Sequence, residues 1–275
     1  MLPPYSVLIS VYSKEQPQYL QAAIESVFCQ TVTPSEIVLV KDGPLTNELE
    51  SLILSYRSPV VKIIALPENK GLSYALNEGL KYCSFELVAR MDSDDICFPD
   101  RFEKQVSYLN SHPEVDIVGA YATKIDEHGN FLNELVKVPI SHENIIRLIW
   151  TCPMNHPTVM FRKDKLVAVG GYNPNAGPRQ DDYDLWFRCA EKGLHFANIP
   201  EPLLYYRFFA DSIKKNSIKV GWYRLKVGLS GCRRLHLPLI ARIGVCIPFF
   251  RSLLPYPLNV YFQNLMNCIN PRKGN

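Results

Sequence analysis

Four short apolar runs, separated by segments in which apolar residues recur at helical spacing, constrain the fold of this chain most. The runs occupy residues 5–11, 36–40, 60–66 and 86–91. Pro17 is placed to start the helix that follows the first run. Buried strands that alternate with amphipathic helices are typical of a parallel sheet covered by helices on both faces. The pattern therefore predicts an α/β fold, in which ligands bind at the carboxyl ends of the strands.

The second half of the chain is less regular. Strands are expected at residues 116–121 and 157–161, and a helix at residues 181–192. The composition then becomes basic and apolar. This change predicts a boundary between a domain of residues 1–210 and a C-terminal segment of residues 211–275.

An acidic cluster follows the fourth apolar run. Asp92, Asp94 and Asp95 place three carboxylates within four residues, and these repel one another unless a cation or solvent neutralises them. Mg2+ and Mn2+ prefer oxygen ligands, and Mg2+ is often held by one or two carboxylates together with substrate phosphates. The cluster is therefore either a metal–diphosphate site or an exposed acidic turn that caps the next helix. The apolar run before it and Pro99 after it favour the metal site.

Polar residues also lie at the ends of the first two runs. Ser10, Val11 and Tyr12 end the first run, and Asp42 follows the second. An aromatic ring can stack on a base, and a carboxylate can accept hydrogen bonds from an imide or a ribose. A core tyrosine and an Asp-Gly turn explain the same residues without a ligand. Lys70, in an Asn-Lys-Gly turn, is either a phosphate ligand or an exposed loop lysine.

Two adjacent acids, Asp181 and Asp182, open the helix expected at residues 181–192. They fit two interpretations. One is that they cap the helix and favour its dipole. The other is that one of them is a general base that deprotonates a sugar hydroxyl, because a carboxylate at a helix N-terminus stays ionised. His156 is either an imidazole near the site or a structural histidine.

The formal net charge of +3 conceals an asymmetry. Residues 1–210 carry 19 basic and 26 acidic residues, a net charge of −7, whereas residues 211–275 carry 11 basic residues and one acid, a net charge of +10. Such a segment predicts an acidic partner, either a membrane surface or a nucleic acid. Its basic residues include Lys214, Lys215, Lys219, Arg224, Lys226, Arg233 and Arg234, interleaved with Trp222, Tyr223 and Leu225. The segment either contacts anionic lipid or forms a basic helical subdomain packed on the body.

The start of the sequence lacks a charged segment followed by a long apolar stretch, so no secretory signal is expected. The longest apolar stretch, residues 237–250, contains Arg242 and two prolines and is shorter than the roughly 20 residues that cross a bilayer. The eight cysteines include no C-x-x-C pair, which favours free thiols in a reducing compartment. We therefore expect a cytoplasmic protein.

Taken in order, these motifs resemble glycosyltransferase family two over about residues 5–208. The matching pieces are residues 6–12, 23–31, 37–43, 69–72, 91–95, 99–101 and 181–186. The resemblance implies the GT-A fold: a Rossmann-like, mostly parallel nucleotide-binding half joined to an acceptor-binding half, here with a basic C-terminal helical appendage. In style the chain is similar to bacterial exopolysaccharide and lipooligosaccharide transferases of the amylovoran type.

The resemblance also implies a site. It places Ser10, Val11, Tyr12, Asp42, Lys70, Asp92 and Ser93 against the nucleotide-sugar. Asp94, together with Asp92, would bind Mn2+ or Mg2+. Asp182 would be the catalytic base. The family has a Glu-Asp pair where this chain has Asp181-Asp182, so either carboxylate could act. His156 would lie on the acceptor side.

The implied activity is inverting transfer of a sugar, with galactose and N-acetylglucosamine as the leading candidates, from a UDP-sugar to a lipid-linked saccharide. This implies a peripheral location on the cytoplasmic face of the inner membrane and no nucleic acid as partner. One alternative is a non-catalytic polysaccharide- or lipid-binding subunit, against which both acidic motifs argue. Another is a sugar nucleotidyltransferase, which would need a glycine-rich loop after the first strand, where residues 12–17 contain no glycine.

Overall fold

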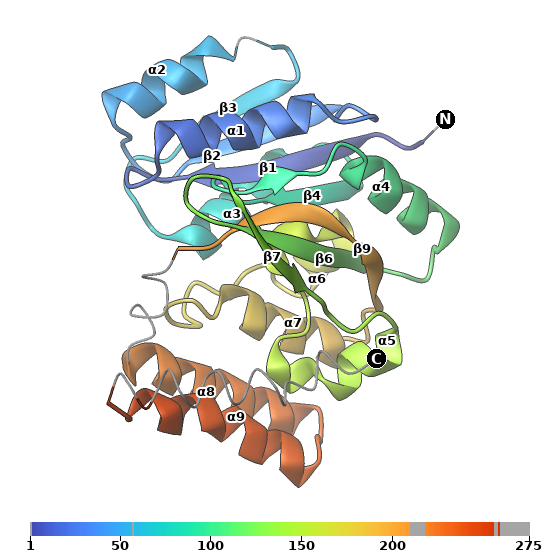
Figure 1. Ribbon diagram of the computed structural model, residues 1–275. Coiled ribbons are helices and arrows are strands. Elements are labelled where there is room, and N and C mark those ends of the chain that lie inside the picture. Colours follow the sequence, from blue (N-terminus) through green and yellow to red (C-terminus); the bar gives the residue numbers. More distant parts are fainter. Residues whose placement is uncertain (1, 57, 210–217, 256–257, 259–275) are drawn as a thin grey trace.

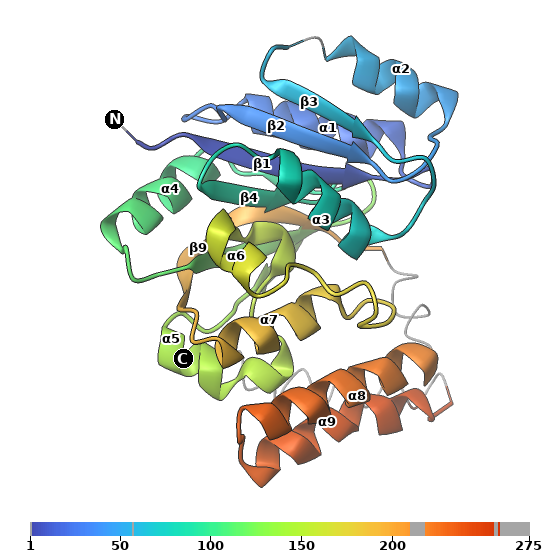
Figure 2. The same ribbon diagram turned by 180° about the vertical axis from the view of Figure 1, so that it is seen from behind.

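A mixed sheet with helices on both faces forms the body of the molecule (Figures 1 and 2). The computed structural model describes residues 2–56, 58–209, 218–255 and 258. The strands are β1 (Tyr5–Val11), β2 (Glu36–Lys41), β3 (Val61–Ala65), β4 (Leu87–Met91), β5 (Ile96–Cys97), β6 (Ile117–Ile125), β7 (Phe131–Val136), β8 (Met160–Arg162) and β9 (Phe196–Arg207). The helices are α1 (Pro17–Phe28), α2 (Asn47–Ser55), α3 (Leu72–Tyr82), α4 (Arg101–Ser111), α5 (His142–Arg147), η1 (Ile149–Thr151), η2 (His156–Thr158), α6 (Lys163–Ala168), α7 (Asp181–Glu191), α8 (Ile218–Arg234) and α9 (Leu239–Ser252).

The first half of the sheet is parallel, as the sequence predicts: β3, β2, β1 and β4 lie side by side in that order. Successive side chains of β1 point to opposite faces. Val7 and Ile9 enter the apolar layer under α1, α2 and α4, whereas Leu8 enters the layer under α3, α6 and α7. The prediction that all four strands are buried on both faces is wrong for β3. That strand ends the sheet, so its side chains are partly or fully exposed.

The second half of the sheet is mixed. β8 runs antiparallel to β4 and β6, and β9 runs parallel to β6. The predicted strand at residues 157–161 is wrong at its start, because Pro157 and Thr158 belong to the turn η2 and the strand begins at Met160. The sequence did not indicate α2, β5, β7 or the long strand β9. Pairing with strands that are far away in sequence defines β5 and β9, whereas β7 forms a hairpin with the preceding strand β6.

The described part of the C-terminal segment is a pair of helices, α8 and α9, that packs on the body. In both views the pair lies on the far side of α7 from the sheet (Figures 1 and 2). Leu225 and Cys232 of α8, with Ala241 and Val245 of α9, join the same apolar layer as α3 and α7. The boundary expected at residue 210 lies outside the described residues, so the division into residues 1–210 and 211–275 stays a prediction. None of the described helices has both the length and the apolar character needed to span a membrane.

Close approach between α8 and α7 requires glycine at position 231. A Cβ atom there would lie 2.3 Å from the Phe187 ring. We expect Gly231→Val to lower the thermal midpoint, because overpacking costs about 1–3 kcal/mol and each kcal/mol corresponds to about 2–4 °C in a chain of this size. Ser230→Val, at an exposed position of the same helix, is the control. Equal midpoints for the two variants in calorimetry would contradict this packing.

Candidate active site

Two adjoining cavities lie beyond the carboxyl ends of β1, β2 and β4. The first has a volume of about 650 Å³ and the second about 510 Å³. The first is bounded by the ends of these strands, and the second lies between the acidic turn after β4 and the start of α7. Leu72, Asp92, Arg179 and Tyr206 line both cavities. A ligand in the first cavity would therefore meet a ligand in the second at these four residues.

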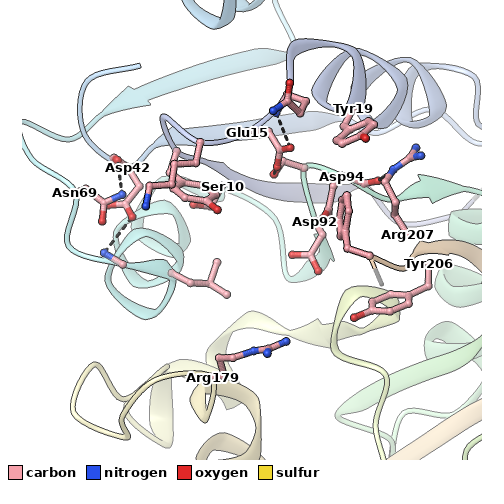
Figure 3. A pocket seen from close by; sticks show the side chains of 17 residues that line it. Ser10, Glu15, Tyr19, Asp42, Asn69, Asp92, Asp94, Arg179, Tyr206 and Arg207 are labelled. Carbon is pink, nitrogen blue, oxygen red and sulfur yellow. Dashed lines mark hydrogen bonds between the residues drawn. The ribbon is translucent and has the colours of Figure 1, made fainter. Parts of the chain in front are cut away.

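The ends of β1 and β2 shape the first cavity (Figure 3). Ser10, Tyr12 and Asp42 line it. The ring of Tyr12 is 43% exposed and so is free to stack on a flat ligand. Asp42 is buried, and its two carboxylate oxygens accept the backbone N–H groups of Lys70 at 2.9 Å and Gly71 at 3.0 Å. Asp42 thus also ties the end of β2 to the start of α3.

Two residues that were expected to bind the nucleotide-sugar do not line this cavity. The side chain of Val11 is fully buried in the core. The Lys70 Nζ atom lies 2.9 Å from Glu68 Oε1 and over the ring of Tyr74. The structure therefore does not bring the side chains of Val11 and Lys70 to the cavity, because strand alternation turns the first inward and a neighbouring acid holds the second.

The acidic turn after β4 brings three carboxylates together. Oxygen atoms of Asp92, Asp94 and Asp95 lie within 4.8 Å of one another. Arg90, at the end of β4, pairs with Asp92. Arg207, at the end of β9, donates its backbone N–H to Asp95 Oδ1 at 2.8 Å and its Nε–H to the Asp94 carbonyl oxygen at 2.7 Å. Two arginines thus hold the turn, and the sequence did not indicate either of them.

The turn carries more negative charge than its surroundings neutralise. Burial, together with the neighbouring Asp92 and Glu15 carboxylates, raises the pKa of Asp94 to about 7. Burial and the other two aspartates raise the pKa of Asp95 well above its usual range. Asp95 Oδ2 is buried and has no hydrogen-bond partner among the described residues. Crowded carboxylate oxygens with an unsatisfied atom fit a hard divalent cation.

Glu15 and Arg179 complete the first cavity, and the sequence pattern predicted neither of them as a site residue. Glu15 lies just after β1 and accepts the hydroxyl hydrogen of Ser93, and both residues line the cavity. Burial raises the pKa of Glu15 above its usual value. Arg179 lies in the loop before α7 and points toward the acidic turn from the other side of the cavity (Figure 3). Its place two residues before the Asp181-Asp182 pair is the signal that could have found it.

The start of α7 presents Asp181 and Asp182 to the second cavity. Asp182 Oδ1 accepts the backbone N–H of Tyr183 at 2.8 Å, and Oδ2 accepts the Cys152 thiol at 3.4 Å. Asp181 Oδ1 accepts the Ser73 hydroxyl hydrogen. Burial raises the pKa of Asp182, against the opposing effects of the Cys152 hydrogen bond and the charge of Arg224. The Asp182 carboxylate is therefore a base whose proton affinity exceeds that of an exposed aspartate.

His156 also lines the second cavity. Its Nε2 atom lies 2.9 Å from the Tyr172 hydroxyl, and its ring packs edge-on against Trp186. Burial and the charge of Arg90 lower the pKa of His156 well below its usual range, so the imidazole is neutral at neutral pH. The structure thus places the expected acceptor-side histidine at the cavity wall, held by a structural hydrogen bond.

The apolar surface of the C-terminal pair differs from the expected one. Leu225 and Tyr223 were predicted to contact lipid. Leu225 is buried and Tyr223 packs on Gly177, so neither is free to enter a lipid headgroup layer. Arg224 faces the second cavity, while Trp222 is 44% exposed. The exposed apolar residues lie instead along α9 and just beyond it: Leu239, Ile240, Ile243, Ile247, Phe250 and Leu253. Lys214 and Lys215 lie outside the described residues.

Comparison with known proteins gives the family. Residues 6–170, more than half of the chain, match the family described as Glycosyl transferase family 2. The chain belongs to this family. It is therefore a glycosyltransferase, as the resemblance of its motifs implied.

Two relatives and one solved structure are similar to this family 2 transferase over most of its length. It is 43% identical over 234 residues to the amylovoran biosynthesis glycosyltransferase AmsE of Erwinia amylovora, covering 82% of this chain and 86% of AmsE. It is 34% identical over 215 residues to an Escherichia coli UDP-Gal:alpha-D-GlcNAc-diphosphoundecaprenol beta-1,3-galactosyltransferase, covering 78% and 77%. S. aureus TarS 1-349 in complex with UDP superposes with a TM-score of 0.69 at 16% identity, covering 98% of this chain and 78% of TarS. The predicted GT-A fold is confirmed.

Proposed function

We propose that this family 2 transferase moves a sugar from a UDP-sugar to a lipid-linked saccharide in bacterial surface polysaccharide synthesis, with inversion at the anomeric carbon. The observation that carries the proposal is the meeting of the two cavities at Asp92 and Arg179, with an acidic turn on one side and Asp182 on the other. Galactose and N-acetylglucosamine are the leading donor sugars. The names of AmsE and of the galactosyltransferase that acts on a diphosphoundecaprenol-linked sugar support this class of reaction.

The first cavity suits a nucleotide diphosphate. Tyr12 can stack on the base, the Ser10 hydroxyl can donate or accept a hydrogen bond at the nucleoside, and the Asp42 carboxylate can accept one. Asp94 and Asp92 would hold Mn2+ or Mg2+, which when bound neutralises a diphosphate leaving group. Arg179 faces the same space and can bind a phosphate oxygen. These residues orient the donor so that its sugar points toward the second cavity.

The second cavity suits the acceptor. We assign to Asp182 the removal of the proton from the attacking hydroxyl, since this half-buried residue lines that cavity. The hydroxyl oxygen then forms the new bond to the anomeric carbon, and the bond to the diphosphate breaks on the opposite face. One direct displacement inverts the configuration. Asp181 keeps its carboxylate on the Ser73 hydroxyl, which makes it the weaker candidate for the base.

A screen of nucleotide-sugars tests the proposal. The full chain is incubated with UDP-galactose, UDP-N-acetylglucosamine, UDP-glucose or GDP-mannose, a bacterial lipid extract, and Mn2+, Mg2+ or EDTA. We expect one UDP-sugar to release UDP and to label the lipid fraction only when metal is present. UDP binding without release would favour a non-catalytic subunit. In a parallel incubation with UTP and a sugar 1-phosphate, release of pyrophosphate would favour a nucleotidyltransferase.

We also propose that the α9 surface rests on the anionic cytoplasmic face of the inner membrane. Its exposed apolar side chains at positions 240, 243, 247 and 250 share one face of the helix, as in helices that lie in a lipid interface. The net charge of +10 in residues 211–275 complements anionic headgroups. This surface therefore keeps the transferase where lipid-linked acceptors are found.

Vesicle binding tests the membrane proposal. We expect Ile243→Asn combined with Phe250→Asn to weaken binding to phosphatidylglycerol vesicles by at least tenfold, since each buried apolar side chain contributes about 1.5–3 kcal/mol. Leu54→Asn, which alters an exposed leucine on α2, is the control. Sedimentation with vesicles is the measurement. Unchanged sedimentation of the double variant, or binding to DNA in place of vesicles, would contradict the proposal.

A further inference from the structure

Arg224 departs from the pattern of a surface-binding basic helix. It lies on α8, in the basic segment, but its side chain lines the second cavity together with Asp182. Its Nη2 atom donates to the Thr151 carbonyl oxygen at 3.3 Å. Its guanidinium group lies over the ring of Tyr183, 4.5 Å from the ring centroid. Arg224 therefore points toward the second cavity.

The packing of α8 fixes this arginine in place. A Cβ atom at Gly228 would lie 2.7 Å from the Tyr183 hydroxyl and 2.4 Å from Val245 Cγ1. The Tyr183 hydroxyl itself donates to the Trp150 carbonyl oxygen at 2.6 Å. α8 therefore sits as near to α7 as its glycines permit. Because α8 packs so closely on α7, the side chain of Arg224, one turn before Gly228, lies near the start of α7.

A cation near Asp182 favours its ionised form, which is the form that acts as a base. Its hydrogen-bond donors include the Tyr183 backbone N–H and the Cys152 thiol. Asp181, Tyr172 and Tyr183 also interact electrostatically with it, and a negative charge on any of them would favour protonation of Asp182. Arg224 is a positive charge that opposes these effects and the effect of burial. Arg90, His156 and Arg179 line the same cavity.

We propose that Arg224 is a positioning residue for Asp182: helix α8 supplies the charge that keeps this carboxylate ionised and facing the acceptor. The Thr151 and Cys152 backbone links the two side chains, because Arg224 holds the first of these residues and the second donates to Asp182. The C-terminal helical pair is then part of the active site and not only an appendage. This inference rests on the proposed function of Asp182.

The pH profile of kcat/KM tests the inference. As the pH falls through the pKa of Asp182, the base is protonated and activity is lost, so an increase in that pKa moves the acidic limb to higher pH. We expect Arg224→Gln to move the limb upward by about one pH unit, which gives about a tenfold loss on the limb and recovery at alkaline pH. Arg224→Lys keeps the charge and should leave the limb in place. Arg147→Gln, at an exposed position of α5, is the matched control.

An equal loss of activity at every pH in Arg224→Gln, with the limb unmoved, would overturn the inference. If Arg224→Gln does not fold, Arg224→Lys still decides: a limb that moves upward in the lysine variant also overturns it. Failure of the proposed function looks different, because the unsubstituted chain would then show no metal-dependent transfer at any pH.

Discussion

Asp182→Asn is expected to lower the rate of sugar transfer by about 10²–10⁴-fold, the usual contribution of a positioned general base. The amide has nearly the same shape as the carboxylate and can keep an oxygen for the Tyr183 backbone N–H, so the fold is expected to survive. UDP affinity should not change, because Asp182 lines the second cavity and not the first. Initial rates with a lipid-linked acceptor and equilibrium binding of UDP measure the two effects.

The neighbouring acid provides a matched control for this substitution. Asp181→Asn makes the same chemical change one residue earlier, at a side chain that accepts the Ser73 hydroxyl hydrogen. We expect it to retain most of the activity, since an amide oxygen can accept the same bond. Near-normal turnover in Asp182→Asn, or a loss confined to Asp181→Asn, would assign the base to the other carboxylate.

Asp94→Asn is expected to abolish metal-dependent UDP binding and transfer, and at the same time to stabilise the metal-free protein. The pKa of Asp94 is about 7 in the fold, against an ordinary value of 3.8, so the folded state holds this proton more tightly than the unfolded state. The stability that this group contributes is complete below about pH 4 and is lost as the pH rises through about 7. At pH 7.5 the charged side chain therefore destabilises the fold, and the neutral amide removes that cost.

Thermal unfolding at pH 7.5 measures this prediction. The metal-free variant should unfold several degrees above the unsubstituted chain, at about 2–4 °C per kcal/mol. Mn2+ should raise the midpoint of the unsubstituted chain and have little effect on the variant. Asp164→Asn, at an exposed position of α6, should change neither property. A variant that still responds to Mn2+, or that unfolds at a lower temperature than the unsubstituted chain, would contradict the assignment of Asp94.

The sequence predicts the parts of the site that follow strands of the parallel sheet. Tyr12, Asp42 and Asp94 each come within three residues of the end of an apolar run, and adjacent parallel strands bring such residues to one edge. The prediction of the sheet is incomplete where paired strands are far apart in sequence. β9 pairs with β6 and β5, which are both far from it in sequence. Periodicity does not report such pairings.

The supporting residues of the site were unpredictable for the same reason. Arg207 binds Asp95 across 112 positions of sequence, and Cys152 reaches Asp182 across 30. Arg224 carries the same charge as its exposed neighbour Lys226, and only the packing of α8 turns it inward. From composition alone, all the basic residues of this segment were expected on one surface that faces an acidic partner. The fold divides them between the second cavity and the outside of the molecule.

The anomeric configuration of the product tests the central claim most directly, because it reports how the two cavities work together. The full chain is supplied with metal, a lipid-linked acceptor and the UDP-sugar found by the screen, labelled with carbon-13 at the anomeric position. The one-bond carbon–proton coupling of the isolated lipid-linked product gives the configuration. From an α-linked donor we predict a β-linked product, formed by direct displacement with Asp182 as the base. An α-linked product would contradict this account.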